Sequence, residues 1–137
     1  LKFSFSKENE IGFQLLQLGI STYNIINVVL THLHLDHTDG FKDFPNVEVI
    51  VNEDEFKNPS VHFPELDPNW FNPKTVRYKK DMIAIFGEAY PLTKAEDLLL
   101  IPTNGHIKHP VSVLFKTDDF DVLFAGDVCY HQDQLIS

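Results

Sequence analysis

The chain has 137 residues, 43% hydrophobic and 23% charged, which is the composition of one folded globular domain and excludes a disordered segment. Its 20 acidic residues outnumber 11 basic ones, and the net charge of −9 argues against nucleic acid or an anionic membrane surface as a partner. The longest apolar runs are only a few residues long, so we expect no membrane span.

The first elements are expected to be a helix and a strand. Apolar residues recur at helical spacing over residues 8–18, which predicts an amphipathic helix, and Gly19 follows where a left-handed cap would end it. The short run at 25–30 is rich in β-branched residues and predicts a strand buried on both faces. This strand would lead the chain directly to His32.

The rest of the chain is expected to contain mostly strands. A strand is predicted at 47–51 and a short helix at 53–57, before a proline-rich loop at 58–74. The aromatic residues of this loop, Trp70 and Phe71, would either wall a pocket or cover the core. Strands mixed with a few helices predict a layered α/β or α+β domain. The remaining strands are predicted at 82–86, 97–101, 111–116 and 121–125.

Four potential metal ligands fall within six consecutive residues after the first strand: His32, His34, Asp36 and His37. In an extended segment alternate side chains share a face, so the first two histidines would point at one ion while Leu33 and Leu35 turn into apolar packing. A bend after Leu35 would let the other two ligands face a second ion. Imidazole and carboxylate ligands without a thiolate suit zinc best, although iron, manganese or cobalt would tolerate them. The alternative is a group of surface histidines on a polar loop.

The segment from His32 to His37 matches the H-x-H-x-D-H signature of the metallo-β-lactamase superfamily, which the chain resembles over nearly its whole length. Two further segments resemble the family's in the same order: Thr103-Asn104-Gly105-His106 and Gly126-Asp127. The resemblance implies an αββα sandwich. It also implies that His32, His34 and His106 hold one metal, that Asp36 and His37 contribute to a second, and that Asp127 bridges the two.

The family pattern is incomplete in this sequence. The strands that normally precede the first helix are missing, and so is a last ligand histidine beyond Asp127, for which His131 is too near. We therefore expect residues 1–137 to be a single partial domain, either the central portion of a larger hydrolase or a form shortened at both ends. The second of the two zinc sites would then lack a ligand, and exposed strand edges would favour a homo-oligomer.

Tyr130 follows Asp127 by three residues, and this arrangement resembles the N-acyl homoserine lactonase branch of the superfamily. The resemblance implies a zinc-dependent hydrolase whose metal-activated hydroxide attacks an ester, lactone or thioester carbonyl of a small molecule. Tyr130 would stabilise the oxyanion and Asp36 would pass a proton to the leaving oxygen. The alternatives are a hydrolase of small phosphodiesters or phosphotriesters and a metal-binding remnant without activity. With one cysteine, Cys129, and no signal peptide, we expect a cytoplasmic protein.

Overall fold

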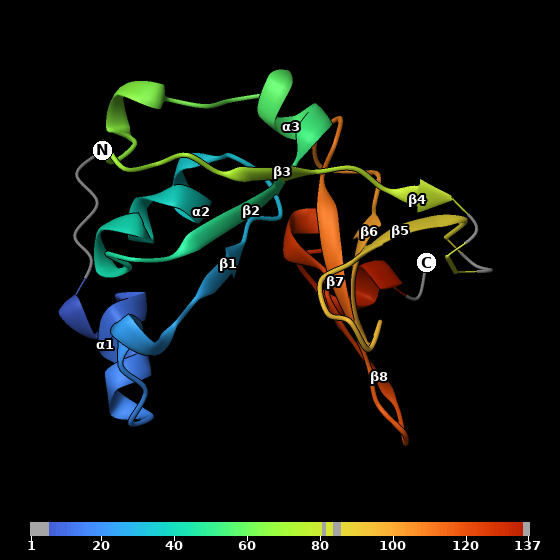
Figure 1. Cartoon of the computed structure of the whole chain (residues 1–137), viewed down its shortest axis with the longest axis horizontal. Coiled ribbons are helices and arrows are strands. Elements are labelled where there is room, and N and C mark those ends of the chain that lie inside the picture. Colours follow the sequence, from blue (N-terminus) through green and yellow to red (C-terminus); the bar gives the residue numbers. More distant parts are fainter. Residues whose placement is uncertain (1–5, 81, 84–85, 136–137) are drawn as a thin grey trace.

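Two sheets lie side by side in the computed structural model, which describes residues 6–80, 82–83 and 86–135 (Figure 1). The N-terminal half carries a parallel sheet and three short helices. Its helices are α1 (Ile11–Gln17), α2 (Leu35–Thr38) and α3 (Glu53–Lys57). Its strands pair in the order β1-β2-β3 and are β1 (Asn27–Val29), β2 (Glu48–Asn52) and β3 (Lys74–Val76). Val28 stands opposite Val49 in this sheet, and Ile50 stands opposite Lys74.

The C-terminal half is an antiparallel sheet in the order β4-β5-β6-β7-β8, and the described residues between its strands form no helix (Figure 1). Its centre is formed by the apolar pair β6 and β7, in which Leu100 stands opposite Val113. The five strands are β4 (Lys79–Lys80), β5 (Glu88–Pro91), β6 (Leu98–Pro102), β7 (Val111–Lys116) and β8 (Asp121–Phe124). The α+β class expected from the sequence is confirmed.

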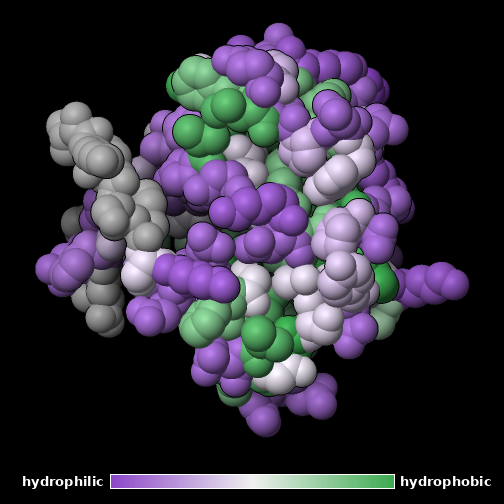
Figure 2. Space-filling model, turned by 90° about the vertical axis from the view of Figure 1, so that its left-hand side faces the viewer, coloured by the Kyte–Doolittle hydropathy of each residue, from purple (hydrophilic) through white to green (hydrophobic). Residues whose placement is uncertain are grey.

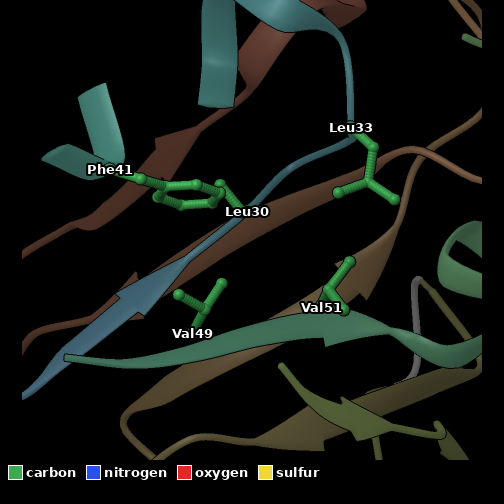
Figure 3. Packing of buried hydrophobic residues seen from close by; sticks show 5 residues of the cluster. All are labelled: Leu30, Leu33, Phe41, Val49 and Val51. Atoms are coloured by element: carbon green, nitrogen blue, oxygen red, sulfur yellow. The ribbon is translucent and has the colours of Figure 1, made fainter. Parts of the chain in front are cut away.

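Buried apolar side chains fix the strand ends where the candidate ligands begin. One cluster lies between the parallel sheet and the segment that follows α2 (Figure 3), and its members are Leu30, Leu33, Phe41, Val49 and Val51. A second cluster joins the two sheets, because Ile50 and Val76 of the parallel sheet pack with Leu100 and Val111 of the antiparallel sheet. The two halves therefore share a core.

A backbone hydrogen bond also joins the two sheets beside the histidine segment. The N–H of Val111, at the start of β7, donates to the carbonyl of Thr31 at 3.0 Å. On the other side of this segment, the N–H of Leu30 donates to the carbonyl of Ile50 at 2.9 Å. The end of β1 is thus held between β2 and β7.

The first predicted helix is present but shorter than residues 8–18. Lys7–Asn9 forms a separate 3-10 turn, and Gly19 ends the helical segment with a φ of 74°, in the left-handed region expected of it. No residue of α1 is buried, so the amphipathic pattern does not place an apolar face in the core. The helix instead rests on a polar contact, in which the N–H of Gly12 donates to Oδ2 of Asp43 at 3.2 Å.

The prediction that the first strand is buried on both faces was wrong. Among the described residues β1 pairs only with β2, which makes it an edge strand, and Ile26 just before it is exposed. Burial begins only at Leu30, where the chain enters the junction between the sheets.

Three observed strands were not expected from the sequence, and one expected strand differs. β3, β4 and β5 are short, and β5 ends in a proline, so none of them carries a long apolar pattern. Of the strand predicted at 82–86, residues 82, 83 and 86 have no strand structure and residues 84 and 85 lie outside the described residues. Met82, Ile83 and Phe86 nevertheless pack against the apolar side chains of β5 and β6.

Exposed apolar side chains lie near α1, along β8 and on the proline-rich loop, where they include Val61, Phe63 and Leu66. Figure 2 shows the face that includes α1, where hydrophilic residues cover the middle and hydrophobic ones gather towards the upper and lower ends. Near α1 the exposed side chains are Leu16, Leu18, Tyr23 and Ile26, and along β8 they are Phe120, Leu123 and Phe124. Across the described part of the chain, no helix has the length and apolar character needed to cross a membrane.

Candidate metal centre

The segment from His32 to His37 changes from extended to helical at the position where a bend was expected. His34 is extended, with φ −65° and ψ 150°, and α2 begins at the next residue. Leu33 is fully buried, as its alternation with the histidines predicts, but Leu35 is 42% exposed. The prediction for Leu35 was wrong because the strand-like alternation ends when the helix starts.

Nitrogen and oxygen atoms from three parts of the chain converge beside this segment. One group comprises His32, His34 and His106, and another comprises His32, His37 and Asp127; within each group the ligand atoms lie within 4.8 Å of one another. Nε2 of His106 lies 3.2 Å from Nδ1 of His34. The structure thus brings together five of the six residues predicted as metal ligands.

Asp127 belongs to the second group and also approaches His106 of the first. Its Oδ2 is 3.5 Å from Nε2 of His106 and 3.9 Å from Nε2 of His32. Its Oδ1 is 3.4 Å from Nε2 of His37. One carboxylate therefore presents a different oxygen to each group, which is the placement that a bridging ligand requires.

The chemistry of this cluster fits a bound divalent cation. Nε2 of His32 is buried without a hydrogen-bond partner, a costly state for a polar atom that a bound cation would relieve. Ligand atoms about 2.1 Å from a tetrahedral zinc ion stand about 3.4 Å apart, close to the 3.2 Å and 3.5 Å separations around His106. Neutral imidazoles and a carboxylate form a donor set suited to zinc.

Burial keeps the imidazole of His32 neutral, which is the form that binds a metal ion. The side chain is 1% exposed, and this burial, together with the neighbouring histidines His37 and His34, lowers its pKa to about 4. The imidazole is consequently neutral at pH 7, with a lone pair free on one nitrogen.

Asp36 lies at the edge of the cluster. Its side chain is 77% exposed, and its Oδ2 is 3.7 Å from Nε2 of His37. It belongs to neither group of converging ligand atoms in the described structure, so its role as a ligand and proton carrier stays a prediction. His131 pairs with Asp133 at 3.2 Å and also belongs to neither group.

The hydroxyl of Tyr130 contacts two of the predicted ligands. It lies 2.8 Å from Nδ1 of His106, and it donates to Oδ2 of Asp127 over 3.4 Å. Desolvation and the charge of Asp127 raise the pKa of Tyr130, so the hydroxyl stays protonated and can donate. Tyr130 is therefore within reach of the reacting atoms if substrate binds at the cluster.

Thr31 and Gly126 support the cluster, and sequence reasoning gave neither of them a role. Oγ1 of Thr31 lies 3.1 Å from Nδ1 of His32 and 3.5 Å from Nδ1 of His37, so one oxygen can accept from both rings and leave each Nε2 for a metal. Gly126 has a φ of 57°, and a Cβ there would lie 3.0 Å from Cγ2 of Thr31. The residue before Asp127 must be small for the loop to pack on Thr31.

Ser112 of β7 also supports the centre and was missed for lack of any motif. This fully buried hydroxyl donates to the carbonyl of Ala125 at 3.1 Å and lies 3.0 Å from Oγ1 of Thr103. Ala125 lies two residues before Asp127, and Thr103 is the first residue of the loop that contains His106. One side chain thus ties both C-terminal ligand loops to the same strand.

The aromatic residues of the proline-rich loop cover the core. Ring centroids of Trp70 and Phe71 lie 6.0 Å and 4.9 Å from that of Phe41. His62 of the same loop pairs with Asp67 at 3.0 Å. A separate cavity of about 600 Å³ reaches the centre on the side of α1, with Asp36 and His37 in its lining.

The family model of the metallo-beta-lactamase superfamily matches residues 4–135. The chain belongs to this superfamily. It is 30% identical over 146 aligned positions to two proteins named probable metallo-hydrolases, from Mycobacterium bovis and Mycobacterium tuberculosis. The alignment includes 98% of this chain and 47% of each relative, so the chain spans about half the length of the curated relatives it matches.

Solved structures with the same fold include an AiiA mutant of B. thuringiensis with N-decanoyl-L-homoserine bound at its active site. Another is an N-acyl homoserine lactone hydrolase with the product N-hexanoyl-L-homoserine bound at its catalytic metal centre. Each has a TM-score of 0.67 and 22% sequence identity, over 88% of this chain and 45% of the solved one. The predicted fold family is confirmed.

Proposed function

We propose that this chain carries the metal-binding part of a hydrolase that cleaves an ester, lactone or thioester of a small molecule. The observation that supports this most directly is the convergence of five ligand residues, with Nε2 of His32 buried and without a hydrogen-bond partner. Superfamily membership supports the same function, since the curated relatives are named metallo-hydrolases.

In this proposal the ligand atoms divide into two sets. Nε2 of His32, Nδ1 of His34 and Nε2 of His106 would hold a first zinc ion, because these atoms face one another. Nε2 of His37 would hold a second ion together with Asp127, which lies between the sets, and with Asp36. A divalent cation bound there would supply a Lewis acid and lower the pKa of coordinated water from its high value in bulk water to about 7.

Two side chains would act on the substrate itself. The protonated hydroxyl of Tyr130 stands beside His106 and can donate a hydrogen bond to the carbonyl oxygen as negative charge develops there. Asp36 is exposed beside His37 and can carry a proton to the leaving oxygen. The lactone-derived ligands named for the structural neighbours favour this carbonyl chemistry.

A small substrate is favoured over a macromolecular one. The cavity of about 600 Å³ beside Asp36 and His37 has the size of a small-molecule site. The net charge of −9 disfavours nucleic acid. The single cysteine supports a reducing compartment such as the cytoplasm, and the apolar residues exposed along β8 support association with a second copy.

The test combines metal content with turnover. Protein purified without chelator is expected to contain at least one zinc-type ion per chain, and the loaded protein is expected to hydrolyse members of a panel of lactones, thioesters and esters. The same panel includes phosphodiesters and phosphotriesters. Turnover confined to phosphoesters would overturn the carbonyl assignment, while bound metal without turnover of any compound would reduce the chain to a metal-binding unit.

A further inference from the structure

Glu55 is a buried acidic residue outside the groups of converging ligand atoms. It lies in α3, where the side chain of Asn52 caps the helix by accepting from the N–H groups of Asp54 and Glu55 at 2.8 Å and 3.1 Å. The carboxylate is 0% exposed, and burial raises its pKa. A buried carboxyl group is costly unless it has a structural or functional partner.

One oxygen of Glu55 has a partner in the histidine segment. Oε1 accepts a hydrogen bond from the N–H of Leu33 at 3.1 Å. Leu33 stands between His32 and His34, so this contact ties the peptide between two predicted ligands to α3. The contact also explains how a segment that is extended for only a few residues keeps a fixed position.

The other oxygen of Glu55 has no partner, and neither does a nitrogen of His34. Oε2 of Glu55 and Nε2 of His34 are both buried without a hydrogen bond. The opposite nitrogen of His34, Nδ1, faces His106 at 3.2 Å. Since Glu55 contacts the N–H of Leu33, the residue directly before His34, the unpartnered oxygen and the unpartnered nitrogen belong to neighbouring groups. Nε2 of His34 carries a proton when Nδ1 binds a metal, and Oε2 of Glu55 can accept a hydrogen bond.

We propose that Glu55 is a positioning residue for the metal centre: it anchors the peptide between His32 and His34 and accepts the hydrogen bond of Nε2–H of His34 when Nδ1 binds the cation. A histidine that binds metal through one nitrogen commonly donates its other N–H to a carboxylate, which fixes the tautomer and strengthens the ligand. The contact to Leu33 is already present, and the contact to His34 forms on binding, directly or through one water.

This inference rests on the proposed metal centre, so the test begins with zinc affinity. Glu55→Gln is the sharpest variant, because glutamine has the same shape but only one acceptor oxygen. In the variant an NH2 group replaces one of the two carboxylate oxygens. Either the N–H of Leu33 or Nε2–H of His34 therefore loses the oxygen that accepts its hydrogen bond. We expect its zinc affinity at pH 7.5, measured by chelator competition, to fall about 10- to 100-fold.

A purely structural role predicts a different result. If Glu55 only supported the fold, Glu55→Gln would lower the melting temperature of the metal-free protein, and the loss of zinc affinity would follow from that lower stability. We expect the metal-free melting temperature to stay unchanged or rise, because a buried acid is removed, while affinity falls. Asp54→Asn removes an acidic group from an exposed neighbouring position and should change neither value.

The outcomes separate the two proposals. Zinc binding by the wild type with equal affinity in Glu55→Gln would overturn the role of Glu55 alone, and a wild type without zinc binding would overturn the metal centre and this role together. If Glu55→Gln does not fold, nitrogen NMR of the zinc-loaded wild type decides. The inference requires His34 bound through Nδ1 with a proton on Nε2, and metal on Nε2 would overturn it.

Discussion

The histidines that follow β1 come from one short segment, whereas His106 and Asp127 come from two loops of the antiparallel sheet. The histidines after β1 are held in place by the packing of buried Leu33 and by the hydrogen bond of Glu55 to Leu33, and His32 is itself buried. The second set is partly exposed and held by hydrogen bonds of Ser112 and by close packing of Gly126 on Thr31. The ligands of the first set are therefore neighbours in the sequence, whereas the ligands of the second set are brought together by contacts between strands.

The largest effect is expected from removal of the ligand that the two groups share. His32→Ala should lower zinc affinity by more than about 100-fold, beyond the effect of losing an outer contact, because His32 belongs to both groups of converging ligand atoms. Metal analysis after purification measures this directly. His131→Ala, which changes an exposed histidine outside both groups, is the matched control. An undiminished metal count in His32→Ala would contradict the ligand assignment.

The next effect is a loss of stability of the metal-free protein at acidic pH. The pKa of His32 is about 4 in the folded protein and 6.5 when unfolded, so below pH 6.5 the unfolded chain takes up a proton that the folded one does not. Neutral His32 therefore contributes about 3 kcal/mol to the free energy of unfolding above pH 6.5. This contribution is lost as the pH falls towards 4. Urea unfolding of wild type and His32→Gln should show a flatter pH dependence in the variant. Equal slopes would contradict the prediction.

A smaller effect tests the packing that holds Asp127. Gly126→Ala should destabilise the protein by about 1–3 kcal/mol, because the residue has a positive φ and its Cβ would crowd Thr31. Gly19→Ala is a matched control, since Gly19 also has a positive φ but nothing lies within 4 Å of an added Cβ. Chemical denaturation gives both values. Only Gly126→Ala should also weaken zinc binding. Equal effects in the two variants would show that crowding of Thr31 by the added Cβ does not matter.

The smallest effect is expected at Ser112. Ser112→Ala should lower the free energy of unfolding by about 1–2 kcal/mol, because it removes the hydrogen bond between the fully buried hydroxyl and the carbonyl of Ala125. Since the same hydroxyl contacts Thr103, we expect weaker zinc binding even under conditions where the variant is fully folded. Ser60→Ala, at an exposed position, serves as the control in the same assays. Unchanged affinity in folded Ser112→Ala would show that the ligand loops do not depend on this residue.

Sequence reasoning found the elements whose patterns are local. The apolar run before His32, the strand near 47–51 and the last three strands were all predicted within one or two residues of their observed ends. β4 was missed because two lysines carry no apolar alternation, and β5 because it is short and ends in proline. The parallel and antiparallel grouping of the strands depends on contacts that no local pattern encodes.

The same division holds for the candidate site. The four candidate ligands at 32–37 could be predicted because imidazole and carboxylate groups at such close spacing are typical of a metal site, whereas His106 and Asp127 could be predicted only through the resemblance to the superfamily. Glu55 could not, since a glutamate in a short helix with acidic neighbours is typical of a solvated surface. Ser112 stands in a strand that is otherwise apolar at its start, and only the positions of Ala125 and Thr103 in space reveal its use.

The meeting of His34 and His106 has a consequence for folding. The two rings are 72 residues apart in the sequence, so their nitrogens come together only after a long loop has closed and both sheets have packed. In a chain that has formed only its first half, a cation can reach the histidines next to β1 but not His106. If the proposed centre binds zinc, uptake at full affinity during refolding would report the last large step of assembly, and its rate should follow the docking of the two halves.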